Sequence, residues 1–353
     1  MALHWSEWPE DVLARLRAGS VIPAHPLALD GGRALDPRRQ RALTRYYIDA
    51  GAGGLAVGVH TTQFAIREAG LFEPVLRIAA ETAAEWTDRP ILRIAGLCGR
   101  TDQALGEADT ALGLGYHAGL LSLAAFHGAS QDDVIAHCAT IAEEIPVIGF
   151  YLQPAVGGIE LGVDFWRRFA AIDNVIAIKI APFNRYRTLD VIRGVVTAGA
   201  ERRISLYTGN DDHIVGDLLT PYRLLRQGEP VTVRIVGGLL GHWSVWVEAA
   251  VRLLGRCRQA VSGGVVEADL LALDPQVTDC NGAFFDVANG FKGCIAGCNE
   301  VLRRQGLLAG IWCLDPEEHL SPGQAEQIDR VYASYPDLND DLFVKANLER
   351  WLA

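Results

Sequence analysis

The sequence lacks the features that mark membrane, exported and nucleic-acid-binding proteins. No run of about 18 or more apolar residues is present, and the first residues do not show the basic-then-apolar pattern of a secretory signal. There is no cluster of basic residues, and the net charge of −11 makes nucleic acids and anionic membranes unfavourable partners. We therefore expect a cytoplasmic protein that acts on a small molecule.

The cysteines do not form a recognisable framework. Their number is odd, their spacing is scattered and no CxxC motif occurs, so the sequence predicts neither a disulfide scaffold nor a zinc site. Two of them, Cys294 and Cys298, lie four apart on a predicted helix and can face one another, although small buried apolar side chains are the simpler interpretation. The seven positions are Cys98, Cys138, Cys257, Cys280, Cys294, Cys298 and Cys313.

Strand-like and helix-like segments alternate along most of the chain. The predicted strands cover residues 20–23, 54–59, 91–95, 119–123, 146–151, 175–179, 204–207 and 231–236. Eight strands alternating with helices predict a parallel sheet, and eight such units can close into a (β/α)8 TIM barrel of the α/β class. Only helices are predicted after residue 260. We expect a barrel with a short N-terminal helix over 1–260 and a helical C-terminal extension over 261–353.

Residues at the carboxyl ends of the strands are the candidates for chemistry, because active sites of such barrels lie at that end. These residues are His25, Thr61, Thr62, Phe126, His127, Tyr151, Gln153, Lys179, Asn184, Asn210, Asp211 and Gly237.

Lys179 closes the apolar strand VIAIK, which is expected to bring it into the interior. Burial lowers the pKa of an amine, and a neutral amine can attack a ketone to form a Schiff base. Tyr151 ends the neighbouring strand, and we expect its phenol to meet Lys179 and transfer protons. Thr61 and Thr62 offer hydroxyls and backbone amides for a carboxylate. The alternative is an exposed lysine paired with an acid.

Other polar residues at this end allow two interpretations each. The histidines (His25, His60, His127 and His242) can be acid/base groups or structural hydrogen bonders. Residues 210–212 can bind a metal or cap the following helix. Gly237 and Gly238 can let backbone approach a ligand, or can simply turn the chain after the eighth strand.

The order and spacing of several motifs resemble the dihydrodipicolinate synthase/N-acetylneuraminate lyase family of lysine-dependent class I aldolases. The matching motifs are VIPAHP at 21–26, GLAVGVHTTQF at 54–64, PVIGFYLQP at 146–154, VIAIK at 175–179 and LYTGNDD at 206–212. The step of 28 residues from Tyr151 to Lys179 also fits the family.

The resemblance implies a role for each matching residue. Lys179 would form the Schiff base with a 2-oxo acid such as pyruvate, Tyr151 would relay protons, and Thr61 and Thr62 would bind the carboxylate, with one hydroxyl joining the relay. The substrate-binding candidates are Thr61, Thr62, Phe126, Gln153, Gly209 and Gly237. The resemblance implies no metal or organic cofactor, and a homo-oligomer, either a dimer or a tetramer.

Departures from the family pattern set limits on the reaction. Val156 replaces the arginine that the synthase carries five residues beyond its tyrosine, so we do not expect dihydrodipicolinate synthase itself. Phe126, Leu152 and Val156 indicate a less polar distal pocket, suited to an aromatic or aliphatic aldehyde. The expected activity is that of an aldolase or lyase. Three alternatives stay open: a dehydratase of 2-oxo-3-deoxy sugar acids, a non-catalytic ligand-binding barrel, and a metal-dependent aldolase that uses the histidines and Asp211.

Overall fold

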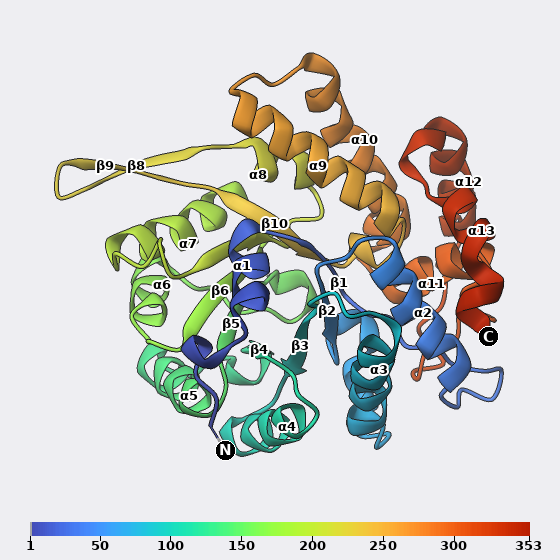
Figure 1. The fold of residues 1–353 in the computed structure, drawn as a ribbon, viewed down its shortest axis with the longest axis horizontal. Coiled ribbons are helices and arrows are strands. Elements are labelled where there is room, and N and C mark those ends of the chain that lie inside the picture. Colours follow the sequence, from blue (N-terminus) through green and yellow to red (C-terminus); the bar gives the residue numbers. More distant parts are fainter. Residues whose placement is uncertain (1) are drawn as a thin grey trace.

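A computed structural model describes residues 2–353 and shows eight parallel strands surrounded by helices (Figure 1). The strands pair in the order β1-β10-β7-β6-β5-β4-β3-β2, and a parallel bridge between Ala24 and Ala56 joins the two ends of the sheet, so the barrel is nearly closed. The predicted TIM barrel is confirmed. Its strands are β1 (Val21–Pro23), β2 (Gly54–Val57), β3 (Leu92–Leu97), β4 (Ala118–Leu121), β5 (Val147–Leu152), β6 (Val175–Ala181), β7 (Ser205–Thr208) and β10 (Ile235–Leu240).

Helices follow most strands and form the outer layer. The α-helices within residues 2–353 are α1 (Glu10–Ala18), α2 (Pro37–Asp49), α3 (Phe72–Trp86), α4 (Thr101–Gly113), α5 (Gln131–Glu144), α6 (Val163–Ala170), α7 (Arg185–Thr197), α8 (Ile214–Leu219), α9 (Val247–Gly263), α10 (Ala268–Phe284), α11 (Cys294–Arg304), α12 (Gln324–Ser334) and α13 (Asp341–Leu352). None of the helices within residues 2–353 has the length and apolarity needed to cross a membrane.

Local sequence signals explain where several helices begin. The Asp36 side chain accepts a hydrogen bond from the Arg39 N–H, and Pro37 occupies the first position of α2. The Asn184 side chain likewise accepts from the backbone N–H groups of Tyr186 and Arg187 at the start of α7. Such caps satisfy N–H groups that the first turn of a helix leaves without partners.

The strands are buried on both faces, as expected for a barrel whose inside is filled and whose outside is covered by helices. All seven residues of β6 are buried. One apolar cluster fills the barrel interior, and a second lies between the sheet and the outer helices. The inner cluster includes Ile22, Ile94, Leu120, Ile148, Phe150 and Tyr207. Lys179 faces this inner cluster, because it pairs with Phe150 and Tyr207.

The eighth barrel strand lies further along the chain than predicted. Residues 222–233 form an antiparallel hairpin, β8 (Tyr222–Arg226) and β9 (Glu229–Val233), which projects away from the barrel in Figure 1. The predicted strand 231–236 straddles the end of this hairpin and the start of β10. A hairpin and a barrel strand give similar apolar patterns, so the pattern alone did not separate them.

The C-terminal helices pack beside the barrel near α2 (Figure 1). The indole N–H of Trp351 in α13 donates to the Asp49 carboxylate at 2.6 Å, and the Arg45 guanidinium donates to the Trp351 carbonyl. The predicted boundary at residues 260/261 falls inside α9, and the division into two domains stays a prediction.

Candidate active site

A small cavity of about 50 Å³ lies at the carboxyl ends of the barrel strands, around Lys179. By the volume that one water needs, it has room for about three to five water-sized groups. Its lining comes from the barrel and from the C-terminal helices: Ala24, Val59, His60, Thr61, Phe150, Leu152, Gln153, Val156, Lys179, Ala181, Phe183, Gly209, Asp211, Gly241, Phe285, Phe291 and Cys294.

Lys179 is 7% exposed and its amine lies over the ring of Phe150, 4.4 Å from the ring centroid. Burial lowers the pKa of Lys179 to about 8, while the negative charge of Asp211 acts in the opposite direction. A substantial fraction of the amine is therefore neutral near pH 8, which is the form that attacks a ketone. The expected burial of this lysine is confirmed.

Gly209 makes room for the lysine. A Cβ atom at this position would come 2.8 Å from Cε of Lys179 and 2.7 Å from the Cβ of Ala181, closer than side chains approach one another. The Gly209 N–H donates to the Ile180 carbonyl at 2.7 Å, which holds the end of β7 against β6. Gly209 thus lines the cavity, as expected, and sets the path of the Lys179 side chain.

Asp211 is a second buried charged group of the cavity. Its side chain is 4% exposed, and Oδ1 accepts a hydrogen bond from the His242 backbone N–H at 2.8 Å. Burial raises the pKa of Asp211 to about 7, although the His242 bond and the charge of Lys179 lower it. The sequence placed Asp211 among the polar residues at the strand ends and indicated it as a metal ligand or a helix cap, but did not indicate it as an acid/base group beside Lys179.

His60 also lines the cavity. Burial and the nearby Lys179 charge lower the pKa of His60 to about 4. The ring is therefore neutral at pH 7 and can donate or accept a hydrogen bond without adding charge.

Tyr151 does not meet Lys179, and this expectation is wrong. It pairs with Ile180, so its side chain points to the outer face of the sheet, while Lys179 and its partner Phe150 point inward. The phenol oxygen accepts a hydrogen bond from the Leu161 N–H at 3.2 Å, and the ring packs on Trp166 of α6. The aromatic residue beside the amine is Phe150, which has no hydroxyl.

The two threonines occupy different surroundings. Thr61 lines the cavity, and its hydroxyl donates to the Ala24 carbonyl at 2.7 Å. Thr62 is fully buried beneath it, donates to the His25 carbonyl at 2.6 Å, and accepts from the Gly58 and Val59 N–H groups. Both hydroxyl protons are already used within the protein, and Thr62 serves to hold the turn.

The remaining substrate-binding candidates divide between the cavity and other places. Gln153 lines the cavity. Phe126 does not; it lies against His137, with ring centroids 4.4 Å apart, and borders a separate hollow. The prediction for Gly237 is also wrong, because this residue lies inside β10 and pairs with Tyr207, where a Cβ atom would come 2.5 Å from the Ser20 nitrogen. The residue after β10 that lines the cavity is Gly241.

Aromatic side chains cover the cavity, and the sequence did not indicate three of them. Phe285 and Phe291 come from the C-terminal extension, and Phe183 follows β6. The rings of Phe183 and Phe291 make an edge contact at 6.1 Å, and both residues have left-handed backbone angles, with φ of 49° and 68°. This conformation is costly for bulky residues and persists where the surroundings enforce it.

Among the other polar candidates, Asn210 accepts a hydrogen bond from the Phe183 N–H at 3.0 Å and donates to Asp217, whereas His127 borders the separate hollow. His25 is fully buried and bonds to Thr44 and the Pro26 carbonyl, and burial lowers its pKa to about 4. Within residues 2–353, no three His, Cys, Asp or Glu side chains come together in a way that could hold a metal ion.

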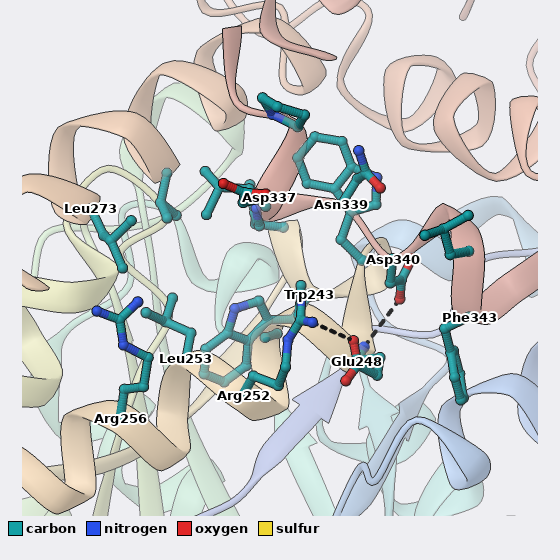
Figure 2. A pocket seen from close by; sticks show the side chains of 18 residues that line it. Trp243, Glu248, Arg252, Leu253, Arg256, Leu273, Asp337, Asn339, Asp340 and Phe343 are labelled. Carbon is teal, nitrogen blue, oxygen red and sulfur yellow. Dashed lines mark hydrogen bonds and ion pairs between the residues drawn. The ribbon is translucent and has the colours of Figure 1, made fainter. Parts of the chain in front are cut away.

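A larger cavity, of about 660 Å³, lies between α9, α10 and the segment before α13 (Figure 2). Arg252 and Glu248 form an ion pair there at 3.4 Å, and the Glu248 N–H bonds to Asp340. Lys179 does not line it, so it is separate from the lysine cavity. The two sites are connected through His242, which lines the larger cavity and donates its backbone N–H to Asp211.

The fold and the buried strand-end amine define a (β/α)8 barrel with a lysine at its mouth. The chain belongs to the dihydrodipicolinate synthetase family, whose family model matches residues 18–220. It is 25% identical over 203 residues to a 4-hydroxy-tetrahydrodipicolinate synthase of Halorhodospira halophila, which is 57% of this chain and 65% of that relative. A synthase of the same name from Thiobacillus denitrificans is 25% identical over 201 residues, 56% of this chain and 64% of that relative. The chain thus spans a little under two thirds of these relatives.

Solved structures share the fold over nearly the whole chain. Dihydrodipicolinate synthase from Acinetobacter baumannii, complexed with pyruvate, has a TM-score of 0.73 at 18% identity and covers 91% of this chain and 99% of its own. CdNal from Clostridium difficile, in complex with mannosamine, has a TM-score of 0.71 at 16% identity, covering 90% and 99%. These similarities concern the fold alone.

Proposed function

We propose that this protein is a Schiff-base-forming lyase that acts on pyruvate or another 2-oxo acid, with Lys179 as the nucleophile. The observation on which the proposal depends is the buried amine of Lys179, whose pKa is lowered to about 8 within a small cavity at the barrel mouth. The neutral amine attacks the ketone, water leaves, and the resulting protonated imine accepts the electron pair of a breaking bond. Two family relatives carry the name 4-hydroxy-tetrahydrodipicolinate synthase, which supports this reaction class.

The turn that carries Thr61 is the proposed site for the substrate carboxylate. Its side-chain hydroxyls already donate to the Ala24 and His25 carbonyls, and the Thr62 and Gln63 N–H groups donate to the Val59 and His60 carbonyls. We therefore expect the remaining backbone N–H groups, those of His60 and Thr61, to hold the carboxylate. No arginine lines the cavity, and the position that would supply one is Val156. This composition argues for a second substrate without a carboxylate. We also propose a cytoplasmic homo-oligomer, a dimer or tetramer.

A second candidate, a barrel that binds a 2-oxo acid without converting it, is favoured by one observation. Phe150 stands beside the amine, and no phenol reaches it from β5. In that case Lys179 would bind the ketone, but no bond between carbon atoms would break.

Product analysis with a panel of 2-oxo acids and 4-hydroxy-2-oxo acids tests the proposed function. We expect native protein to release pyruvate and an aldehyde from at least one 4-hydroxy-2-oxo acid, and Lys179→Ala to release none. Lys345→Ala, which changes an exposed lysine, serves as the matched control and should keep the activity. Release of water without an aldehyde would indicate a dehydratase, and no conversion would favour the binding protein.

A further inference from the structure

The proposed reaction needs a group that moves a proton, and the cavity contains no phenol for this. Formation of the enamine from the imine removes a proton from the carbon next to the ketone, and a positioned base accelerates such transfers by about 10²–10⁴-fold. Tyr151 is on the outer face of the sheet, and the tyrosine that pairs with Lys179, Tyr207, donates its hydroxyl to the Leu16 carbonyl. A different side chain must therefore do this work.

Asp211 has the position and the free oxygen that this step requires. Its carboxylate lines the same 50 Å³ cavity as Lys179 and is 4% exposed. The His242 N–H fixes Oδ1 at 2.8 Å, which leaves Oδ2 available to a bound molecule. His242 itself is held because it opens η6 (His242–Ser244), which one residue separates from the end of β10. The carboxylate is therefore oriented by the backbone and not by a flexible side chain.

We infer that Asp211 is the general acid/base of the active site and takes the place of a phenol. The inference rests on the proposed Schiff base at Lys179. In the lysine imine of pyruvate, Asp211 accepts a proton from C3, and the C3–H electron pair moves into the new carbon–carbon double bond while the imine becomes an enamine. The same proton can return to C3, or pass to the oxygen of an aldehyde as the carbon–carbon bond forms. No oxidant, reductant or further reactant is needed.

The charged and titratable groups around this pair come from four parts of the fold. They are His60 from the turn after β2, Asp212 beside Asp211, His242 after β10, and Cys294, Cys298 and Glu318 from the C-terminal extension. Burial lowers the pKa of His242 to about 4 and raises the pKa of Cys298 to about 12, so neither is charged near pH 7. Burial also raises the pKa values of Asp212 and Glu318, but neither residue lines the cavity, whereas Lys179 and Asp211 do.

Deuterium exchange at C3 of pyruvate, followed by NMR in D₂O, isolates the inferred step from carbon–carbon bond cleavage. We expect native protein to catalyse exchange, and Asp211→Asn to lose about 100-fold or more of it. Asp211→Asn should still form the imine, shown by borohydride trapping of pyruvate. Because Asp211 raises the pKa of Lys179, its removal should also move the acid limb of the trapping rate to lower pH. A variant that only disturbed the structure of the cavity would lower the trapping rate without moving its acid limb to lower pH.

The outcomes separate this inference from the proposed function. If Asp211→Asn supports borohydride trapping and C3 exchange at native rates, the inference about Asp211 is overturned and the proposed Schiff base at Lys179 still holds. Loss of trapping together with exchange in Asp211→Asn would assign Asp211 to imine formation and would also overturn it. Absence of trapping in native protein would overturn the proposed function and the inference with it. If Asp211→Asn does not fold, Asp211→Glu decides, because it keeps a carboxylate and should retain measurable exchange with an altered pH profile.

Discussion

At the scale of single residues, the proposed chemistry depends on two groups of opposite charge, Lys179 and Asp211, buried in one small cavity. Burial favours the neutral form of both Lys179 and Asp211, while each charge stabilises the other, so their pKa values come to about 8 and about 7. These values are close to neutral pH, where acid/base catalysis is most effective. Proton transfer between the two groups changes the charge of each and leaves the net charge of the pair unchanged.

The rate of imine formation should rise with pH through the pKa of Lys179. Protonated lysine has no free electron pair, so the rate should increase from about pH 6, reach half its maximum near pH 8 and level off above about pH 9. An ordinary exposed lysine would give a rise centred above pH 10, at its usual pKa of about 10.4. Borohydride trapping, stopped at fixed times across this pH range, distinguishes the profile of a buried lysine from that of an exposed lysine.

Removing the Tyr151 hydroxyl should leave catalysis unchanged. Tyr151→Phe keeps the ring that packs on Trp166, and only the acceptor for the buried Leu161 N–H is lost. We expect unchanged pyruvate trapping and C3 exchange, with a loss of about 1–3 kcal/mol in the free energy of unfolding. Chemical denaturation measures the free energy of unfolding. A large fall in the rate of C3 exchange without a fall in stability would show that Tyr151 transfers the proton.

A phenol can be supplied where the cavity lacks one. The Phe150 ring centroid is 4.4 Å from the Lys179 amine, so Phe150→Tyr should bring a hydroxyl to the mouth of the cavity. In the Asp211→Asn background, we expect this change to restore part of the C3 exchange. The same substitution in Lys179→Ala is the control and should restore none.

At the scale of elements, the end of β7 sets the position of the amine. A methyl group at residue 209 would meet both Lys179 and Ala181. We expect Gly209→Ala to displace the lysine by about 1 Å and to lower the trapping rate by about 100-fold, since displacements of this size have such effects on reacting groups. Gly255→Ala is the matched control, because a methyl group at this position of α9 would have no heavy atom within 4 Å. Equal rates for the two variants would contradict the assigned role.

Sequence patterns predicted the elements better than the directions of their side chains. The apolar strand VIAIK was recognisable, and its lysine is buried with the rest of β6, which continues two residues further to Ala181. The inward direction of Phe150 instead of Tyr151 depends on a register shift between β5 and β6 at Val147 and Ile148. Such an irregularity changes which residues face inward, and it leaves no local sequence signal.

At the scale of the whole molecule, the C-terminal extension completes the cavity. Phe285, Phe291 and Cys294 lie more than 100 residues after Lys179, yet all three line the same space. The sequence predicted this extension as helical, but contacts between segments so far apart have no periodic pattern that would reveal them. The same limit explains why Gly237 was assigned to the mouth, since the projecting hairpin β8–β9 displaced the eighth strand along the chain.

The central claim, that Lys179 forms the Schiff base, is tested most directly by locating trapped pyruvate within the chain. The sequence contains three lysines, Lys179, Lys292 and Lys345, and the latter two are exposed. After incubation with pyruvate and borohydride, peptide mass spectrometry should find one adduct per chain, on the peptide that contains Lys179, and Lys179→Ala should carry none. An adduct on Lys292 or Lys345 alone, or no adduct in the native protein, would contradict the account.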